Sequence, residues 1–412
     1  MEGLKELRRL AYEYYEAALS PENAERRRLH RAVNDLKMER PVVLISEIPF
    51  HELNFDGSLT LKCTDPDLRR VEDRLRKTLF QWKYFPADMI LHPFVSIEKV
   101  VYNTGDGIKI EDDRIYDKTD KDQQGISSHK YHDQLATLED LDKITLPTLT
   151  YDKEETMRRY TKVAEAIGDI VPVKVTAPWG NAYCHPWDDI AMYRGAEPLL
   201  IDLYDEPEFT HEMVSRLFAC AKHRIDQMEA LELFEMNPTS LHCTTALCSD
   251  LDKDYDGGKV TRKNMWFRGM AQIFSCVSKA MHDEFDIQYM KEIAETFGAT
   301  YYGCCEPLDK KIDILEQISN LRKISISPWA DVEIAAEAIN TKYVVGHKPN
   351  PAAVTVPLDE DAHRKDMART LSALKRNGCN ADIVLKDISS AGHNVQNLIR
   401  WEQITMEMVK NF

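Results

Sequence analysis

The sequence has no apolar run long enough to cross a membrane. Its longest apolar stretches fall well short of the roughly 18–20 residues that a transmembrane helix needs. The first residues, Met-Glu-Gly-Leu-Lys-Glu-Leu, are charged and lack the apolar core of a signal peptide. We therefore expect a cytoplasmic protein without a membrane partner.

Glycine and proline are also sparse. The 412 residues include 16 Gly and 18 Pro, scattered along the chain, which excludes a fibrous or low-complexity protein. The apolar fraction of 43% is enough for a large core. The length fits two or three average domains or one large barrel with additions.

The chain lacks a basic stripe. Its 53 Lys and Arg are outnumbered by 69 Asp and Glu, which gives a net charge of −16. Such a surface repels phosphates, so nucleic acid is not an expected partner.

Motifs that would identify several common sites are missing. The nine cysteines form no Cys-x-x-Cys motif, and their odd number does not fit a disulfide framework, so we expect most to be reduced and no zinc ribbon to form. No Gly-x-Gly-x-x-Gly follows a predicted strand, which argues against an open dinucleotide-binding fold.

Apolar runs typical of buried strands alternate with helical patterns along most of the chain. Such alternation predicts a parallel sheet covered by helices. The runs that we interpret as strands are residues 41–47, 88–96, 171–178, 240–245, 272–276, 299–304, 322–327, 343–348 and 382–387. Residues 179–186, directly after the predicted strand at 171–178, are expected to form a loop.

Eight or nine strands fit a closed (β/α)8 barrel of the TIM type better than an open sheet. We expect residues 1–38 to form a helical N-terminal extension and residues 39–412 a single barrel domain. Residues near 101–135 are polar and irregular, and we interpret them as an insertion or flap with a short hairpin.

The segment Tyr-Tyr-Gly-Cys-Cys-Glu-Pro at residues 301–307 carries the most chemistry. Cys304, Cys305 and Glu306 could bind a metal, or a cysteine could act as a nucleophile. Because adjacent strand residues point to opposite faces, at most one of the two cysteines is expected to face the barrel axis. The alternative is that one cysteine packs in the core and the other is incidental.

Other polar residues also follow predicted strands, where barrels place their active sites. We predict catalytic roles for Glu47, His242, Lys386 and Asp387, and substrate contacts for His51, Trp179, Trp329, His347 and Lys348. A structural alternative stays open for each: His242 bonded to backbone, His347-Lys348 in an exposed turn, the tryptophans in packing, and Lys386 and Asp387 in a salt bridge.

Residues 270–285 resemble a segment of the uroporphyrinogen decarboxylase superfamily that reads Ser-Pro-x-Met-Phe-x-Glu-Phe. Thr176-Ala-Pro-Trp179, the segment 195–204 and the stretch through Lys348-Pro-Asn-Pro351 match in order. The resemblance covers residues 165–412 well and 40–100 more loosely. It implies a barrel and either porphyrin decarboxylation or methyl transfer with a corrinoid protein.

The decarboxylase branch carries an Arg-Gln-Ala-Gly-Arg loop after its first strand. Here residues 47–56 contain three acids and no arginine, and acids there would repel a polycarboxylate. The methyltransferase branch holds zinc with a His-x-Cys and a later Cys. In this chain the cysteine is retained but Tyr302 or Gly303 stands at the histidine position. The resemblance thus implies zinc at Cys304, Cys305 and Glu306, joined by a group such as His242, Asp387 or His393.

The expected function is that of an O-demethylase component of anaerobic metabolism. It would move a methyl group from a small methoxylated or methylated compound to the cob(I)amide of a corrinoid protein. The chain has no Asp-x-His-x-x-Gly motif, so the cobalamin would arrive on that partner. A metal-independent decarboxylase or lyase acting on a small carboxylate, and a non-catalytic barrel that binds a corrinoid partner, stay open. So do the identity of the methyl donor and the formation of a homodimer.

Overall fold

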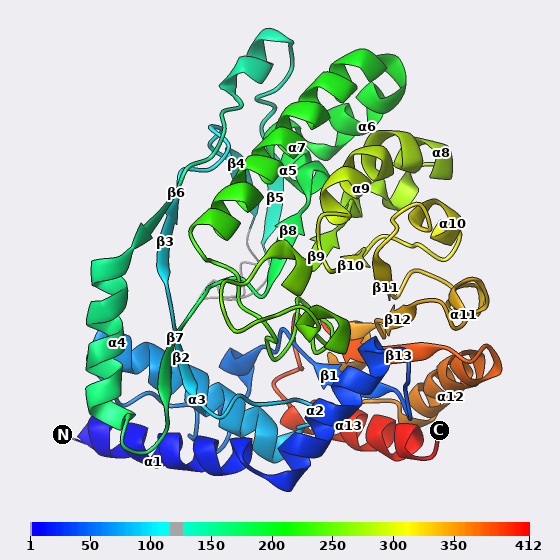
Figure 1. Cartoon of the computed structure of the whole chain (residues 1–412). Coiled ribbons are helices and arrows are strands. Elements are labelled where there is room, and N and C mark those ends of the chain that lie inside the picture. Colours follow the sequence, from blue (N-terminus) through cyan, green and yellow to red (C-terminus); the bar gives the residue numbers. More distant parts are fainter. Residues whose placement is uncertain (1, 116–126) are drawn as a thin grey trace.

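A seven-stranded parallel sheet forms the centre of the fold (Figure 1). The computed structural model describes residues 2–115 and 127–412. The strand order is β1 (Val42–Ile45), β13 (Asn380–Leu385), β12 (Val344–His347), β11 (Leu321–Ile326), β10 (Ala299–Tyr302), β9 (Trp266–Gly269) and β8 (Asn181–Cys184). All residues of β1, β13 and β10 are buried, as in a sheet covered on both faces.

Helices between the strands cover the outer side of the sheet, where α8 to α12 follow one another in Figure 1. They are α5 (Pro186–Arg194), α6 (Ala196–Asp205), α7 (Pro207–Ala230), α8 (Lys279–His282), α9 (Gln288–Ala294), α10 (Ile312–Leu315), α11 (Val332–Ile339), α12 (Glu360–Arg376) and α13 (Val395–Lys410). A π-helical turn, Asp283–Ile287, joins α8 to α9. Gly195, whose φ of 88° breaks the helical backbone, separates α5 from α6.

β1 and β13, the first and last of these strands in the sequence, are neighbours in the sheet, but the described strands form no closed sheet. On the free side of β1, Val43 exchanges hydrogen bonds with Asp88. Beyond it, β2 (Val95–Glu98) and β7 (Val173–Thr176) form a separate parallel pair. The predicted strand at 88–96 is therefore reduced to β2, because residues 88–94 have no continuous ladder.

Three sequence predictions near the sheet were wrong. Residues 240–245 form only an isolated bridge, because Cys243 has a φ of 56° and turns the chain so that Leu241 bonds to Thr244. Residues 272–276 form a 3-10 helix that packs Phe274 against Trp187. The predicted loop at 179–186 contains β8, which pairs with β9.

The N-terminal residues are helical, as predicted, with α1 (Glu2–Ala18) and α2 (Pro21–Asn34). Ser20 caps α2, and its Oγ accepts a hydrogen bond from the Asn23 N–H at 3.1 Å. With α3 (Pro66–Tyr84) and α4 (Lys153–Ile167), α1 encloses a second apolar core beside β2. The division into an extension and one barrel domain stays a prediction.

The predicted insertion contains antiparallel pairs. β3 (Val100–Asn103) pairs with β6 (Leu149–Asp152), and β4 (Asp112–Ile115) pairs with β5 (Ser128–Tyr131). The second pair has the antiparallel arrangement expected of a hairpin, and its strand β5 continues beyond Ser128 to Tyr131. Residues 116–126 of the prediction lie outside the described residues.

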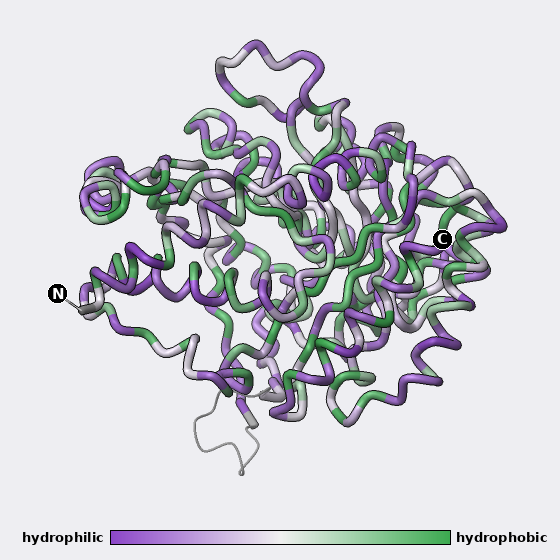
Figure 2. Tube along the Cα trace, turned by 90° about the horizontal axis from the view of Figure 1, so that it is seen from below, coloured by the Kyte–Doolittle hydropathy of each residue, from purple (hydrophilic) through white to green (hydrophobic). Residues whose placement is uncertain are grey.

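Hydropathy follows this architecture. Figure 2 shows apolar segments through the middle of the molecule and hydrophilic segments on the outer helices. None of the helices in the described ranges combines the length and apolarity required for a bilayer span.

A buried ion pair links the sheet to the segment that precedes β9. Lys323 of β11 and Asp382 of β13 are both fully buried, with Nζ and Oδ2 2.6 Å apart. The same Oδ2 accepts hydrogen bonds from the hydroxyls of Thr244 and Thr245 at 2.6 and 2.7 Å. This carboxylate therefore fixes residues 244–245 over the sheet.

Replacing Asp382 with Asn should be strongly destabilising. The change keeps the side-chain shape but leaves the Lys323 ammonium buried without its counter-charge, so we expect the free energy of unfolding to fall by about 3–5 kcal/mol. Urea unfolding followed by circular dichroism measures it. Glu316→Gln, which removes the exposed ion pair with Lys342, is the control and should leave the midpoint unchanged. Equal midpoints for both variants would contradict the assignment.

Candidate functional site

Side chains from several strands meet where the parallel strands end. Glu47 follows β1, Cys304 and Cys305 follow β10, and Lys386 and Asp387 follow β13. His242 and Cys243 come from the bridge segment beside β1. Because parallel strands end at the same edge, residues far apart in the sequence converge here.

The two cysteines lie beyond the strand, in a loop. β10 ends at Tyr302, and Gly303 turns the chain with a φ of 96°. The Sγ atoms of Cys304 and Cys305 are 3.7 Å apart, and both are contacted by Lys386. The prediction that at most one of them faces the barrel axis assumed strand alternation, which does not apply because both cysteines lie in the loop.

Lys386 is the cation of this cluster. Its Nζ lies 3.3 Å from the Sγ of Cys304, 3.6 Å from that of Cys305 and 2.7 Å from Oδ2 of Asp387. The side chain is buried, yet the negative charges of Cys304 and Asp387 outweigh the burial and raise its pKa above the usual range. Lys386 thus stays charged.

Cys304 has the environment of a thiolate. A hydrogen bond from the Cys305 thiol lowers its pKa most, and His242, Arg268 and Lys386 lower it further, against the opposing effect of burial. The same pairing raises the pKa of Cys305. The opposite directions of the two pKa shifts favour ionisation of Cys304 over that of Cys305.

Glu47 connects two further residues, His242 and Cys243, to the site. Oε1 of Glu47 is 3.3 Å from the Sγ of Cys243 and 3.7 Å from Nε2 of His242, and its Oε2 accepts the N–H of Asp387 at 2.8 Å. Glu47, Cys243 and Asp387 all have left-handed backbone conformations, with φ of 53–56°. Such strain at non-glycine residues is concentrated at functional sites.

These residues fit a zinc ion. The ligand atoms of Glu47, His242 and Cys243 lie within 4.8 Å of one another and supply the oxygen, nitrogen and sulfur donors that zinc accepts. Three protein ligands leave one position open, as catalytic zinc sites do.

The carboxylate of Glu306 is bound by backbone amides. Its Oε2 accepts the N–H of Cys304 at 2.9 Å and its Oε1 that of Ala271 at 3.2 Å. Burial, reinforced by the nearby Cys304 charge, raises its pKa to about 7. Metal binding by Glu306 together with Cys304 and Cys305 stays a prediction, and the contacts give Glu306 a role in shaping the thiol loop.

The predicted substrate-binding residues are dispersed. His51 lies 3.9 Å from Glu52, Trp329 is 73% exposed, and Trp179 is partly buried in a bridge to Phe234. His347 is buried near the Thr370 hydroxyl of α12, on the helix side of the sheet.

Lys348, by contrast, reaches the site. It is fully buried, and its Nζ donates to the carbonyl oxygen of Cys243.

Sequence reasoning missed Tyr183, His185 and Arg268. Tyr183 and His185 lie at the end of β8, with ring centroids 4.7 Å apart, and Arg268 lies on β9 with Nη1 3.1 Å from the Tyr183 hydroxyl. A charged residue inside the apolar run Trp266-Phe267-Arg268-Gly269 was the available signal.

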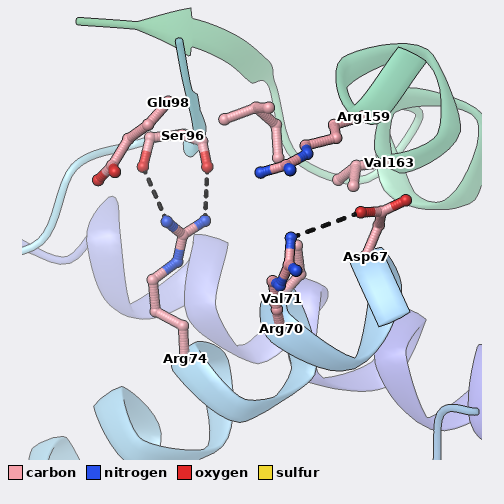
Figure 3. Close-up of a pocket in the computed structure, with 9 residues that line it drawn as sticks. Asp67, Arg70, Val71, Arg74, Ser96, Glu98, Arg159 and Val163 are labelled. Atoms are coloured by element: carbon pink, nitrogen blue, oxygen red, sulfur yellow. Dashed lines mark hydrogen bonds and ion pairs between the residues drawn. The ribbon is translucent and has the colours of Figure 1, made fainter. Parts of the chain in front are cut away.

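Two hollows differ in their distance from the site residues. One of about 250 Å³ is lined by residues that include Glu47 and Cys243. Another of about 190 Å³ lies apart, between α3, β2 and α4 (Figure 3). There Arg74 donates to Ser96 and Arg70 faces Asp67, so internal partners already hold its arginines.

Comparisons with known proteins identify the fold. No family model and no curated protein matches the chain. Among solved structures, a methyltransferase from Methanosarcina mazei is similar over 93% of this chain and 98% of its own, with a TM-score of 0.50 and 10% identity. At that identity the similarity establishes a shared α/β fold.

Cys304 should hold a thiolate below neutral pH. Because its pKa is lowered, the ultraviolet absorbance of one thiolate per chain should persist as the pH falls through 7, whereas ordinary thiols, with a pKa near 8.5, are protonated there. Cys304→Ser should remove this absorbance, and Lys386→Met should shift its loss to higher pH. Cys276→Ser, at an exposed cysteine, is the control. A wild-type titration with ordinary thiols only would refute the thiolate.

Proposed function

We propose that the protein is a methyltransferase of the uroporphyrinogen decarboxylase superfamily. It would move a methyl group from a small methoxylated or methylated compound to the cob(I)amide of a separate corrinoid protein. The observation that carries the proposal is the cluster of two cysteine sulfurs, an imidazole, carboxylates and a buried lysine at one edge of the sheet. The fold shared with a methyltransferase supports it.

The site contains the groups that such a reaction requires. An alkyl ether has a poor leaving group, so the departing oxygen needs a positive charge, a proton donor or a metal. Lys386 supplies a buried positive charge beside Asp387. Glu47 orients the backbone of Asp387 and contacts Cys243.

Zinc fits this assignment. We propose that Glu47, His242 and Cys243 hold it, with Cys304 as a further sulfur donor nearby, and that the bound ion supplies Lewis acidity. The remaining residues orient the donor and the thiol loop.

We also propose that the strands close into a (β/α)8 barrel with this site at its mouth. The neighbouring positions of β1 and β13 support closure, since first and last strands adjoin in such barrels. The corrinoid protein would dock over that mouth, in the cytoplasm.

A second candidate is a metal-independent decarboxylase or lyase acting on a small carboxylate. Arg268 and Lys348 favour it, because both are fully buried cations beside the site and could anchor a carboxylate. This candidate would act without corrinoid and without zinc.

Methyl transfer is the direct test. The purified protein, mixed with cob(I)alamin and a panel of methoxylated aromatics and methylated amines, should form methylcob(III)alamin, which absorbance detects. Cys304→Ser should lower the rate about 10²-fold or more, because it removes the thiolate beside Lys386. Cys276→Ser should keep the wild-type rate. No methyl transfer across the panel would refute the function, and corrinoid-free carbon dioxide release would favour the second candidate.

Metal content tests the zinc assignment. Elemental analysis of the protein as purified should find one zinc per chain, and His242→Ala should lose most of it because an imidazole ligand is gone. His211→Ala, at a histidine that contacts Tyr289 on α9, should keep the metal. A zinc-free protein that still transfers methyl groups would exclude the metal.

A further inference from the structure

Arg268 is a buried cation without an acidic partner among the described residues. It is fully buried on β9. Its Nη1 donates to the Tyr183 hydroxyl at 3.1 Å, its Nη2 lies 3.8 Å from the Met270 sulfur, and its Nε is unpaired. By contrast, the buried Arg76 binds the carboxylates of Glu72 and Glu6. A buried charge without a counter-charge is costly, so its retention indicates a use.

Two tyrosine rings hold the guanidinium in place. Its Cζ lies 4.9 Å from the ring centroid of Tyr183 and 5.2 Å from that of Tyr301. Cation–π contacts offset part of the cost of burial and fix the orientation, but they do not neutralise the charge.

Tyr183 connects this charge to the site. Its ring is partly exposed and lies between His185 and His242, with centroid distances of 4.7 and 6.2 Å. Its hydroxyl oxygen accepts from Arg268, and its hydroxyl hydrogen faces only the weakly accepting Met270 sulfur, at 3.8 Å. The hydroxyl can therefore donate a strong hydrogen bond to a ligand.

Two fully buried lysines, unlike Arg268, have an acidic group nearby. Lys323 pairs with Asp382 at 2.6 Å, and the charge of Asp382 also acts on Lys348. Arg268 contacts no carboxylate among the described residues, so a bound anion would supply its counter-charge. A leaving group that departs as an anion supplies that charge, whereas one that departs as a neutral amine does not.

We propose that Tyr183, positioned and polarised by Arg268, binds the oxygen that leaves the methyl group, and that the methyl donors are aryl methyl ethers. The proposal rests on the methyltransferase function. In the step, the methyl–oxygen bond breaks and its electron pair stays on the oxygen as a phenolate. The Co(I) acceptor supplies the electron pair of the new carbon–cobalt bond and becomes Co(III). The phenolate accepts the Tyr183 hydrogen bond and later takes a proton from water. The aromatic rings of His185 and His242 beside Tyr183 fit an aryl group.

The test compares leaving groups of different charge. Tyr183→Phe and Arg268→Gln should lower kcat for aryl methyl ethers about 10²–10³-fold with little change in KM, since they remove stabilisation of the developing anion. The loss should grow as the phenol becomes less acidic. Donors that release a neutral amine, such as tetramethylammonium, should be almost unaffected, and Arg268→Lys should recover part of the rate. Tyr343→Phe, in the loop before β12, is the control. Equal losses for both kinds of donor, or no loss, would overturn the proposal.

Phenolate binding gives a readout that needs no methyl transfer. 4-Nitrophenol bound to the wild type should ionise at lower pH than in solution, as its visible absorbance reports, and Tyr183→Phe and Arg268→Gln should abolish that shift. If Arg268→Gln does not fold, Tyr183→Phe alone decides. Methyl transfer without either signature would leave the function intact and remove this inference. An Arg268-dependent shift without methyl transfer would remove the function and keep the phenolate site.

Discussion

The buried carboxylate of Asp382 is the contact on which the arrangement of the site depends. It lies on β13, pairs with Lys323 of β11 and accepts three hydrogen bonds from Thr244 and Thr245. Those threonines directly follow His242 and Cys243, so the same carboxylate fixes their position beside Glu47. A polar interaction deep in the sheet thereby determines which groups meet at its edge.

Charge compensation organises the edge itself. The low dielectric of the interior strengthens the attraction between the Lys386 ammonium and the Cys304 thiolate. Each charge offsets the free-energy cost of burying the other. Arg268 adds positive charge from the neighbouring strand. The chain as a whole has a net charge of −16, whereas Lys386 and Arg268 place buried positive charges at the site.

The strands from β10 onward were predictable because each lies in an apolar run that is followed by a helical pattern. Of the polar residues that follow them, Cys304 and Lys386 lie near each other, whereas Trp329 is exposed. The site beside β8 and β9 was not. Trp266–Gly269 and Asn181–Cys184 are four-residue strands whose pairing depends on each other, and neither has a recognisable period alone. The orientation of Cys305 also escaped prediction, since it depends on the turn at Gly303 rather than on the strand. His347 and Lys348 show the same limit: one faces α12 and the other Cys243, although both are polar and adjacent.

The left-handed backbone at Glu47, Cys243 and Asp387 has a consequence for how the chain tolerates change. Glycine would adopt those angles with less strain, but it has no reactive side chain. At these three positions the chain therefore keeps a strained backbone together with a carboxylate or a thiol. Glycine there would relieve the strain but would remove a carboxylate or the thiol, and at Asp387 also the counter-charge of the buried Lys386. Backbone strain and side-chain contacts therefore act on stability in opposite directions at these positions.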